Sequence, residues 1–165
     1  MTNRRWRRAV LGILLATLVV ALPVASEAKK KPSTKRVVEA TVAGKHVKWS
    51  GRYLSFNYGA SGLTIIGTKV RATKTIGVGC PILLDAVTYP VTFETNCSGQ
   101  YAEHAGKRYW FNTGSGPPLQ PSFQVTFDSF DGTVVAGHFS GTLPALIGAT
   151  TPVDIEGTFR GPLNK

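Results

Sequence analysis

The feature that most constrains this chain is a nine-residue pattern that occurs twice in its last third. It reads aliphatic-x-Gly-x-Phe-x-Gly-x-Leu and covers residues 135–143 and 155–163. In an extended strand, a period of two places the aliphatic residues, glycines, phenylalanine and leucine on one face and the polar residues on the other. An inward glycine leaves room for an aromatic ring of a paired strand to lie over bare backbone. The pattern predicts one supersecondary unit used twice, because two copies are too few for a solenoid.

The chain from residue 37 onward keeps this alternation and has no run of apolar residues at helical spacing. Runs rich in Val, Ile, Thr, Tyr and Phe are separated by turn-forming residues such as Asp131-Gly132. The predicted strands are residues 37–43, 46–50, 52–58, 63–71, 74–78, 86–94, 100–103, 107–112, 122–127, 135–143 and 155–163, with a Gly/Pro-rich break at 114–121. The predicted fold is all-β, an antiparallel β-sandwich or partly closed barrel of about 8–10 strands. Essentially no helix is expected apart from a signal peptide.

The first 28 residues have the layout of a secretory signal peptide. Four arginines precede the apolar run 9–21, and small residues follow it. Cleavage is expected after Ala28 or after Ser26, and the general secretory and twin-arginine routes both stay open. The apolar run is short for a membrane span, although an uncleaved anchor is the alternative. No cysteine follows the signal, so we expect a secreted or periplasmic protein without a lipid anchor.

The formal net charge of +10 is distributed unevenly over three segments. The signal carries a net charge of +3, and residues 29–36 carry +5. We expect those eight residues to form a flexible basic stem that touches anionic surfaces through Lys29, Lys30, Lys31, Lys35 and Arg36. Residues 37–165 carry only +2 and are long enough for a single all-β domain. Without a basic stripe in that domain, we expect no nucleic-acid partner.

The two cysteines, Cys80 and Cys97, predict a disulfide. An exported chain with an even number of cysteines favours a bridge over two free buried thiols, which are the alternative. The closed loop would contribute roughly 3 kcal/mol in the chain-entropy model. No histidine stands at ligand spacing from either cysteine, so neither a metal nor another cofactor is expected.

Several short pieces of residues 100–163 form a recognisable series, namely Tyr109-Trp110, residues 123–127, Asp131-Gly132, residues 137–140 and residues 157–159. In these pieces the chain resembles a family of small secreted or lipoprotein-type bacterial β-sandwich domains of uncharacterised function. The resemblance implies a β fold in the cell envelope or extracellular space, and it supplies no catalytic residues. Members of that family are often lipid-anchored, whereas this chain lacks the required cysteine, and the two cysteines present here are not part of the family pattern.

Candidate catalytic residues are few, and no catalytic or metal-binding sequence motif occurs. The sharpest combination is His138 with Glu156 or Arg160 on the outward face of the two repeated strands. A contact between the imidazole and the carboxylate could serve acid–base chemistry in a small secreted hydrolase. The alternative is a polar cross-strand pair on a solvated sheet face. The combination alone does not predict an enzyme.

Aromatic residues supply the binding hypothesis. We expect some of Trp49, Tyr101, Tyr109 and Trp110 to form a platform for a sugar ring, and alternation places Tyr109 and Trp110 on opposite faces. The alternative is that both sheets bury these rings. We therefore expect a non-catalytic module of the envelope with a structural or ligand-binding role. Its partner would be an envelope polysaccharide or protein, and the second hypothesis is a carbohydrate-binding module.

Overall fold

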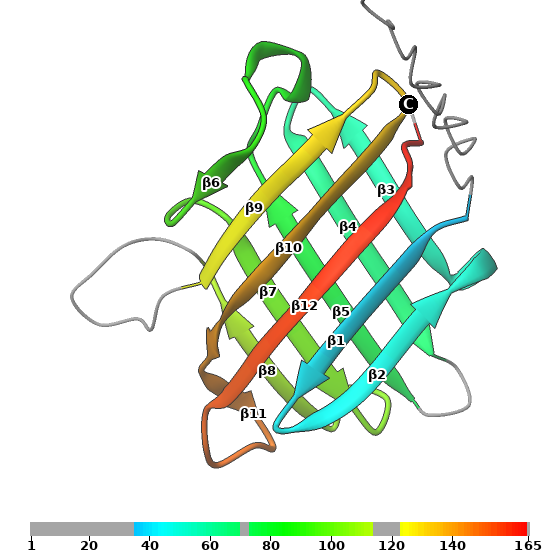
Figure 1. The fold of residues 1–165 in the computed structure, drawn as a ribbon. Helices are drawn as coiled ribbons and strands as arrows, with labels where there is room; N and C mark the ends of the chain where they lie inside the picture. Colours follow the sequence, from blue (N-terminus) through cyan, green and yellow to red (C-terminus); the bar gives the residue numbers. More distant parts are fainter. Residues whose placement is uncertain (1–34, 70–72, 114–122, 165) are drawn as a thin grey trace, which may run out of the picture. The chain divides into compact units, whose positions relative to one another are not determined.

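The computed structural model describes residues 35–69, 73–113 and 123–164, which form two six-stranded antiparallel sheets facing each other (Figure 1). The strands are β1 Val37–Val42, β2 Lys45–Ser50, β3 Leu54–Gly59, β4 Gly62–Lys69, β5 Lys74–Cys80, β6 Val91–Phe93, β7 Ser98–Glu103, β8 Arg108–Asn112, β9 Phe123–Phe130, β10 Val134–Leu143, β11 Ala145–Ile147 and β12 Val153–Pro162. The all-β prediction is confirmed, and of the two predicted architectures the chain adopts the sandwich. The predicted signal peptide, most of the stem and the 114–121 break lie outside the described residues.

The strands are divided between two sheets, sheet A and sheet B. Sheet A has the order β2-β1-β12-β10-β9-β6, and sheet B has the order β11-β8-β7-β5-β4-β3. In the described residues the other regular elements are two 3-10 turns, η1 (Gly51–Tyr53) and η3 (Leu84–Ala86). The core lies between the sheets and is built from the inward residues of nearly every strand.

The two copies of the repeated pattern form β10 and β12, which pair at the centre of sheet A. Their register places Gly137 opposite Phe159 and Phe139 opposite Gly157. A Cβ at Gly157 would lie 2.6 Å from Cζ of Phe139, and one at Gly137 would lie 2.5 Å from Cζ of Phe159. Each ring therefore occupies the space that a side chain on the other strand would fill, as the sequence predicts.

The C-terminal end of β12 connects sheet A to the edge of sheet B. After β12 the chain reaches β3, where the Tyr58 N–H donates to the Asn164 carbonyl (3.1 Å) and the Asn164 N–H donates to the Phe56 carbonyl (2.6 Å). Arg36 fastens the other end of the chain here, because its Nε donates to the Pro162 carbonyl (2.9 Å) and its Nη2 to Asn164. Arg36, which we assigned to the flexible stem, therefore belongs to the folded domain.

The disulfide prediction is confirmed. Cys80 ends β5 and Cys97 precedes β7, and these two strands are neighbours in sheet B. Their Cα atoms lie 4.2 Å apart, and both residues are buried.

The described residues contain twelve strands, more than the predicted 8–10, and two parts of the chain depart from the predicted strands. The predicted strand 86–94 is reduced to β6, because Pro90 lacks the N–H that a ladder needs and Ala86 belongs to η3. β11 was not expected, since three residues between Pro144 and Gly148 are too few to show alternation. It pairs with β8 at the edge of sheet B.

The reciprocal contact between rings and glycines predicts a specific sensitivity. Gly157→Ala should lower the free energy of unfolding by about 1–3 kcal/mol, because its Cβ would meet both the Phe139 ring and the Glu39 carbonyl. Gly59→Ala is the matched control, since that position has open space around it. Urea unfolding followed by tryptophan fluorescence measures both variants. Equal stabilities for the two would contradict the packing described here.

The disulfide predicts a second stability difference. Replacing both Cys80 and Cys97 with alanine should lower the free energy of unfolding by about 3 kcal/mol, because the unfolded chain gains the entropy of an open loop. Reductant should destabilise the natural chain by a similar amount and leave the double variant unchanged. A chain whose urea midpoint ignores reductant would show that the bridge does not contribute.

Candidate functional site

Three of the four aromatic residues predicted to form a platform lie in the core. Trp49, Tyr101 and Trp110 are at most 8% exposed, because alternation turns them toward the opposite sheet. Their polar atoms have partners: Trp110 Nε1 donates to the Thr151 carbonyl (2.9 Å), and Trp49 Nε1 donates to the Lys74 carbonyl (3.4 Å). The prediction that these three rings are available to a ligand is therefore wrong.

The Tyr101 hydroxyl joins a charged cluster at the rim of sheet B. It donates to Glu103 (2.7 Å), whose carboxylate also pairs with Lys74 (3.3 Å) and Arg108 (2.5 Å). Burial raises the pKa of Glu103, but the hydrogen bonds from Tyr101 and Lys74 outweigh it and hold that pKa below its usual value. Burial, followed by the bond to Glu103, raises the pKa of the Tyr101 hydroxyl. The cluster orders the β7–β8 hairpin.

The lowered pKa of Glu103 predicts a pH dependence of stability. Its ionised form should stabilise the fold above its ordinary pKa of about 4.3, and this contribution should be lost as the pH falls through the lowered value. Glu103→Gln should therefore be less stable than the natural chain at pH 7, with the difference shrinking below about pH 4. Urea unfolding at a series of pH values measures it. A difference that is constant with pH would contradict the assignment.

Tyr109, the fourth predicted platform residue, lies on the outer face of sheet B. There it is half-exposed and runs nearly parallel to Phe111, with ring centroids 6.2 Å apart and planes at 12°. Ile147 on β11 stands opposite Tyr109 and is 57% exposed. Tyr109, Phe111 and Ile147 form what we call the aromatic platform. The sequence analysis missed Phe111, although its position two residues after Tyr109 on one strand already places both on one face.

The residues next to the aromatic platform lie on β7 and β5. On β7, Gln100 accepts a hydrogen bond from the Tyr109 hydroxyl (2.8 Å), which fixes that ring's polar end. The Gln100 side chain lies across Gly77 of β5, where a Cβ would come within 2.5 Å of its Cγ. Ala102 follows on the same outer face, opposite Tyr109. The Gln100 side chain thus covers Gly77, and Ala102 is buried, so the surface beside the rings is closed by side chains that lie close to the sheet.

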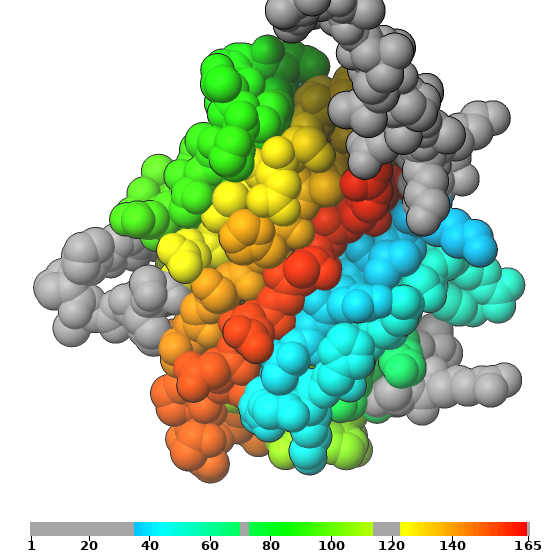
Figure 2. All heavy atoms as spheres, viewed as in Figure 1, coloured from blue at the N-terminus to red at the C-terminus, as the bar shows by residue number. Residues whose placement is uncertain are grey.

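The outer face of sheet A is polar by contrast. Figure 2 shows this face in space-filling form, with β9, β10, β12, β1 and β2 side by side across it. One row across these strands consists of Gln124, Ser140, Glu156, Thr41 and His46, and the next row includes Thr126, His138, Thr158, Glu39 and Lys48. The rows border a shallow open depression of about 550 Å³. Hydroxyl, amide, imidazole and carboxylate groups gather there without an exposed aromatic ring.

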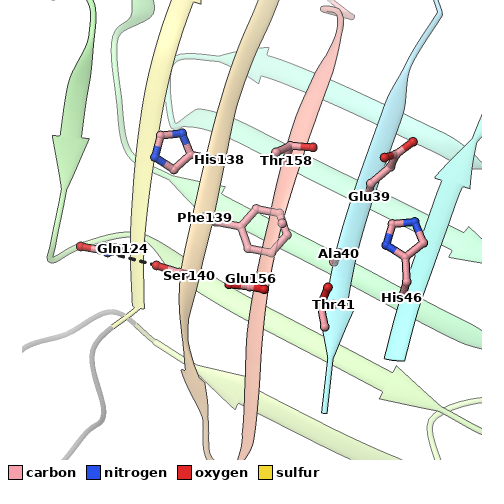
Figure 3. Close-up of a pocket in the computed structure, with 11 residues that line it drawn as sticks. Glu39, Ala40, Thr41, His46, Gln124, His138, Phe139, Ser140, Glu156 and Thr158 are labelled. Atoms are coloured by element: carbon pink, nitrogen blue, oxygen red, sulfur yellow. Dashed lines mark hydrogen bonds between the residues drawn. The ribbon is translucent and has the colours of Figure 1, made fainter. Parts of the chain in front are cut away.

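The structure places His138 and Glu156 on this face, but it does not pair them. His138 stands opposite Thr158, whereas Glu156 stands opposite Ser140. The imidazole Nδ1 of His138 lies 3.2 Å from the Asp128 carboxylate instead, and Figure 3 shows it turned toward β9. The Ser140 hydroxyl accepts a hydrogen bond from Gln124 (3.0 Å). Within the described residues these contacts provide no pairing of a nucleophile with a base.

Neither a metal cluster nor a membrane helix is found in residues 35–69, 73–113 and 123–164. No three His, Cys, Asp or Glu side chains come together there in a way that could hold a metal ion. No helix in the same part of the chain is long and apolar enough to cross a membrane.

Comparison of the chain with protein-family models, curated proteins and solved structures finds no match. The resemblance to small secreted β-sandwich domains therefore stays a prediction. The case for a function depends on the two outer faces of the sandwich.

Proposed function

We propose that this protein is an exported, non-catalytic β-sandwich module that binds a neutral polysaccharide on the aromatic platform of sheet B. The observation that carries the proposal is the half-buried, parallel pair Tyr109 and Phe111 with the exposed Ile147 beside it. Large apolar side chains grouped on the outer face of a sheet mark a candidate binding surface.

The chemistry of the platform suits a sugar ring better than a purely apolar ligand. Each pyranose ring offers an apolar C–H face to an aromatic ring and hydroxyl groups at its edge. The platform provides rings together with the Tyr109 hydroxyl and the Gln100 amide, which can reach those hydroxyls. Gln100 lies on the outer face of β7 beside Phe111, its partner on β8, so its amide is placed next to the rings.

Export supports an envelope polysaccharide as the ligand. The basic and apolar N-terminal segment is typical of a secretory signal, and the disulfide fits an oxidising compartment. Such a compartment places the domain next to polysaccharides of the envelope.

The proposal predicts that removing both rings weakens binding. The double variant Tyr109→Ala and Phe111→Ala should lose at least about tenfold in affinity for cellulose or chitin, since each ring contributes about 1 kcal/mol. Sedimentation of the exported protein with each insoluble polysaccharide measures the affinity. Tyr109→Phe keeps both rings and removes only the hydroxyl, so it should lose clearly less affinity than the double variant.

Tyr53→Ala is the matched control for this experiment. It removes a ring that is 47% exposed on η1, outside the aromatic platform, and it should leave binding unchanged. Circular dichroism checks that each variant is folded. Absence of binding by the natural chain, or equal losses in Tyr53→Ala and the double variant, would overturn the proposal.

A further inference from the structure

The start of β1 and the end of β2 together form a concave basic surface. The sequence predicts two of its residues, Lys35 and Arg36, only as part of a flexible stem that touches anionic surfaces. Antiparallel pairing sets Val37 opposite Ser50, so that residues 35–37 lie against the corner where β2 turns into η1 (Figure 1). A cleft of about 710 Å³ opens between these segments. Four of its lining residues are cations, Lys35, Arg36, Lys48 and Arg52, and none is acidic. We call this the basic cleft.

The charges of the basic cleft are only partly neutralised. Lys48 pairs with Glu39 at 2.5 Å, and this hydrogen bond holds the pKa of the Glu39 carboxyl below its usual value. Arg36 is different, because its guanidinium donates to the neutral oxygens of Pro162 and Asn164, and no carboxylate in the described part of the chain forms an ion pair with it. The same bonds fix its position at the cleft.

Arg52 contributes a second uncompensated charge. Its guanidinium carbon lies 4.7 Å from the centre of the Tyr53 ring, and no carboxylate of the described residues pairs with it. Tyr53 is itself 47% exposed. At the edge of the cleft, the Arg52 guanidinium therefore lies beside the exposed ring of Tyr53.

We propose that the basic cleft binds a linear polyanion, a sugar or polyol chain that carries phosphate or carboxylate groups along its length. Clustered cations repel one another, and an anionic ligand relieves that repulsion. A concave cleft admits a chain, whereas a planar bilayer meets only its rim. The sequence continues the positive charge directly before the cleft, at Lys29, Lys30 and Lys31. This site is separate from the aromatic platform and binds a ligand of opposite electrostatic character.

The test uses a double variant, Lys35→Gln and Arg52→Gln, which removes two cleft charges and leaves the docked Arg36 in place. Its control is Lys45→Gln with Lys107→Gln, which removes two exposed charges outside the cleft. Affinity for polyphosphate and for polygalacturonate is measured by titration at several salt concentrations. Each anionic group that the protein neutralises on a single-stranded polyanion adds about 0.7 to the slope of log K against log salt, so the cleft variant should lose about 0.7 to 1.4 and the control almost none.

Further measurements distinguish a polyanionic chain from an anionic membrane surface and from a nonspecific effect of net charge. Vesicles of anionic phosphatidylglycerol should bind the natural chain more weakly than either polymer does, and neutral dextran should not compete. Equal losses in the two double variants would overturn the proposal, because affinity would then follow net charge alone. Stronger binding to the vesicles, lost in the cleft variant, would overturn it in favour of a membrane surface. Cellulose binding by the cleft variant should be unchanged, which separates this test from that of the proposed function.

Discussion

The structure depends on one packing device, the exchange of phenylalanine rings for glycines between β10 and β12. These strands lie at the centre of sheet A, and each offers a glycine under the ring of the other. A similar contact crosses the sandwich, because a Cβ at Gly99 of sheet B would lie 2.5 Å from Cε2 of Phe123 on β9 of sheet A. Large rings thus fill the space between the sheets while the strands stay close. Val, Ile or Leu at the glycine positions would clash with the rings and force the strands apart.

A consequence of this device is that all polar residues of the central strands point outward. His138, Ser140, Glu156 and Thr158 therefore share one solvated face, on which cross-strand contacts such as that of His138 with Asp128 satisfy part of their polarity. Sheet B carries a different surface, because β8 alternates Trp110 inward with Tyr109 and Phe111 outward. The sandwich presents a polar face and an aromatic face, and the proposed function rests on the second.

Much of the fold could be predicted from the sequence because its signal is local. The alternation within each copy of the repeat and the turn at Asp131-Gly132 depend on near neighbours in the chain. The even number of cysteines is read directly from the sequence. The number of strands could not be predicted from the sequence, because β11 has only three residues and forms by pairing with β8. The sandwich could not be separated from a barrel either, because the pairing of strands distant in sequence decides closure.

The aromatic platform was predicted less well than the fold, because its residues are set by contacts between segments that are distant in sequence. Alternation shows that Tyr109 and Trp110 face opposite ways, but only the tertiary structure shows which way is inward. Trp49 and Tyr101 resemble surface aromatics in sequence because each carries a polar atom, and that atom finds a partner at the rim of the sandwich. The basic cleft could not be predicted from the sequence, because it forms only when β1 pairs with β2 and brings Arg36 and Arg52 to one surface.

The central functional claim is that a neutral polysaccharide binds the aromatic platform of sheet B and not the polar face of sheet A, and NMR tests it most directly. Titration of the isotope-labelled protein with cellohexaose or chitohexaose reports which backbone amides change their environment. Binding on the platform should shift the amides of Tyr109, Phe111 and Ile147 and of their neighbours on β7. Shifts confined to His138, Ser140 and Glu156 on sheet A, with β8 unchanged, would contradict the claim.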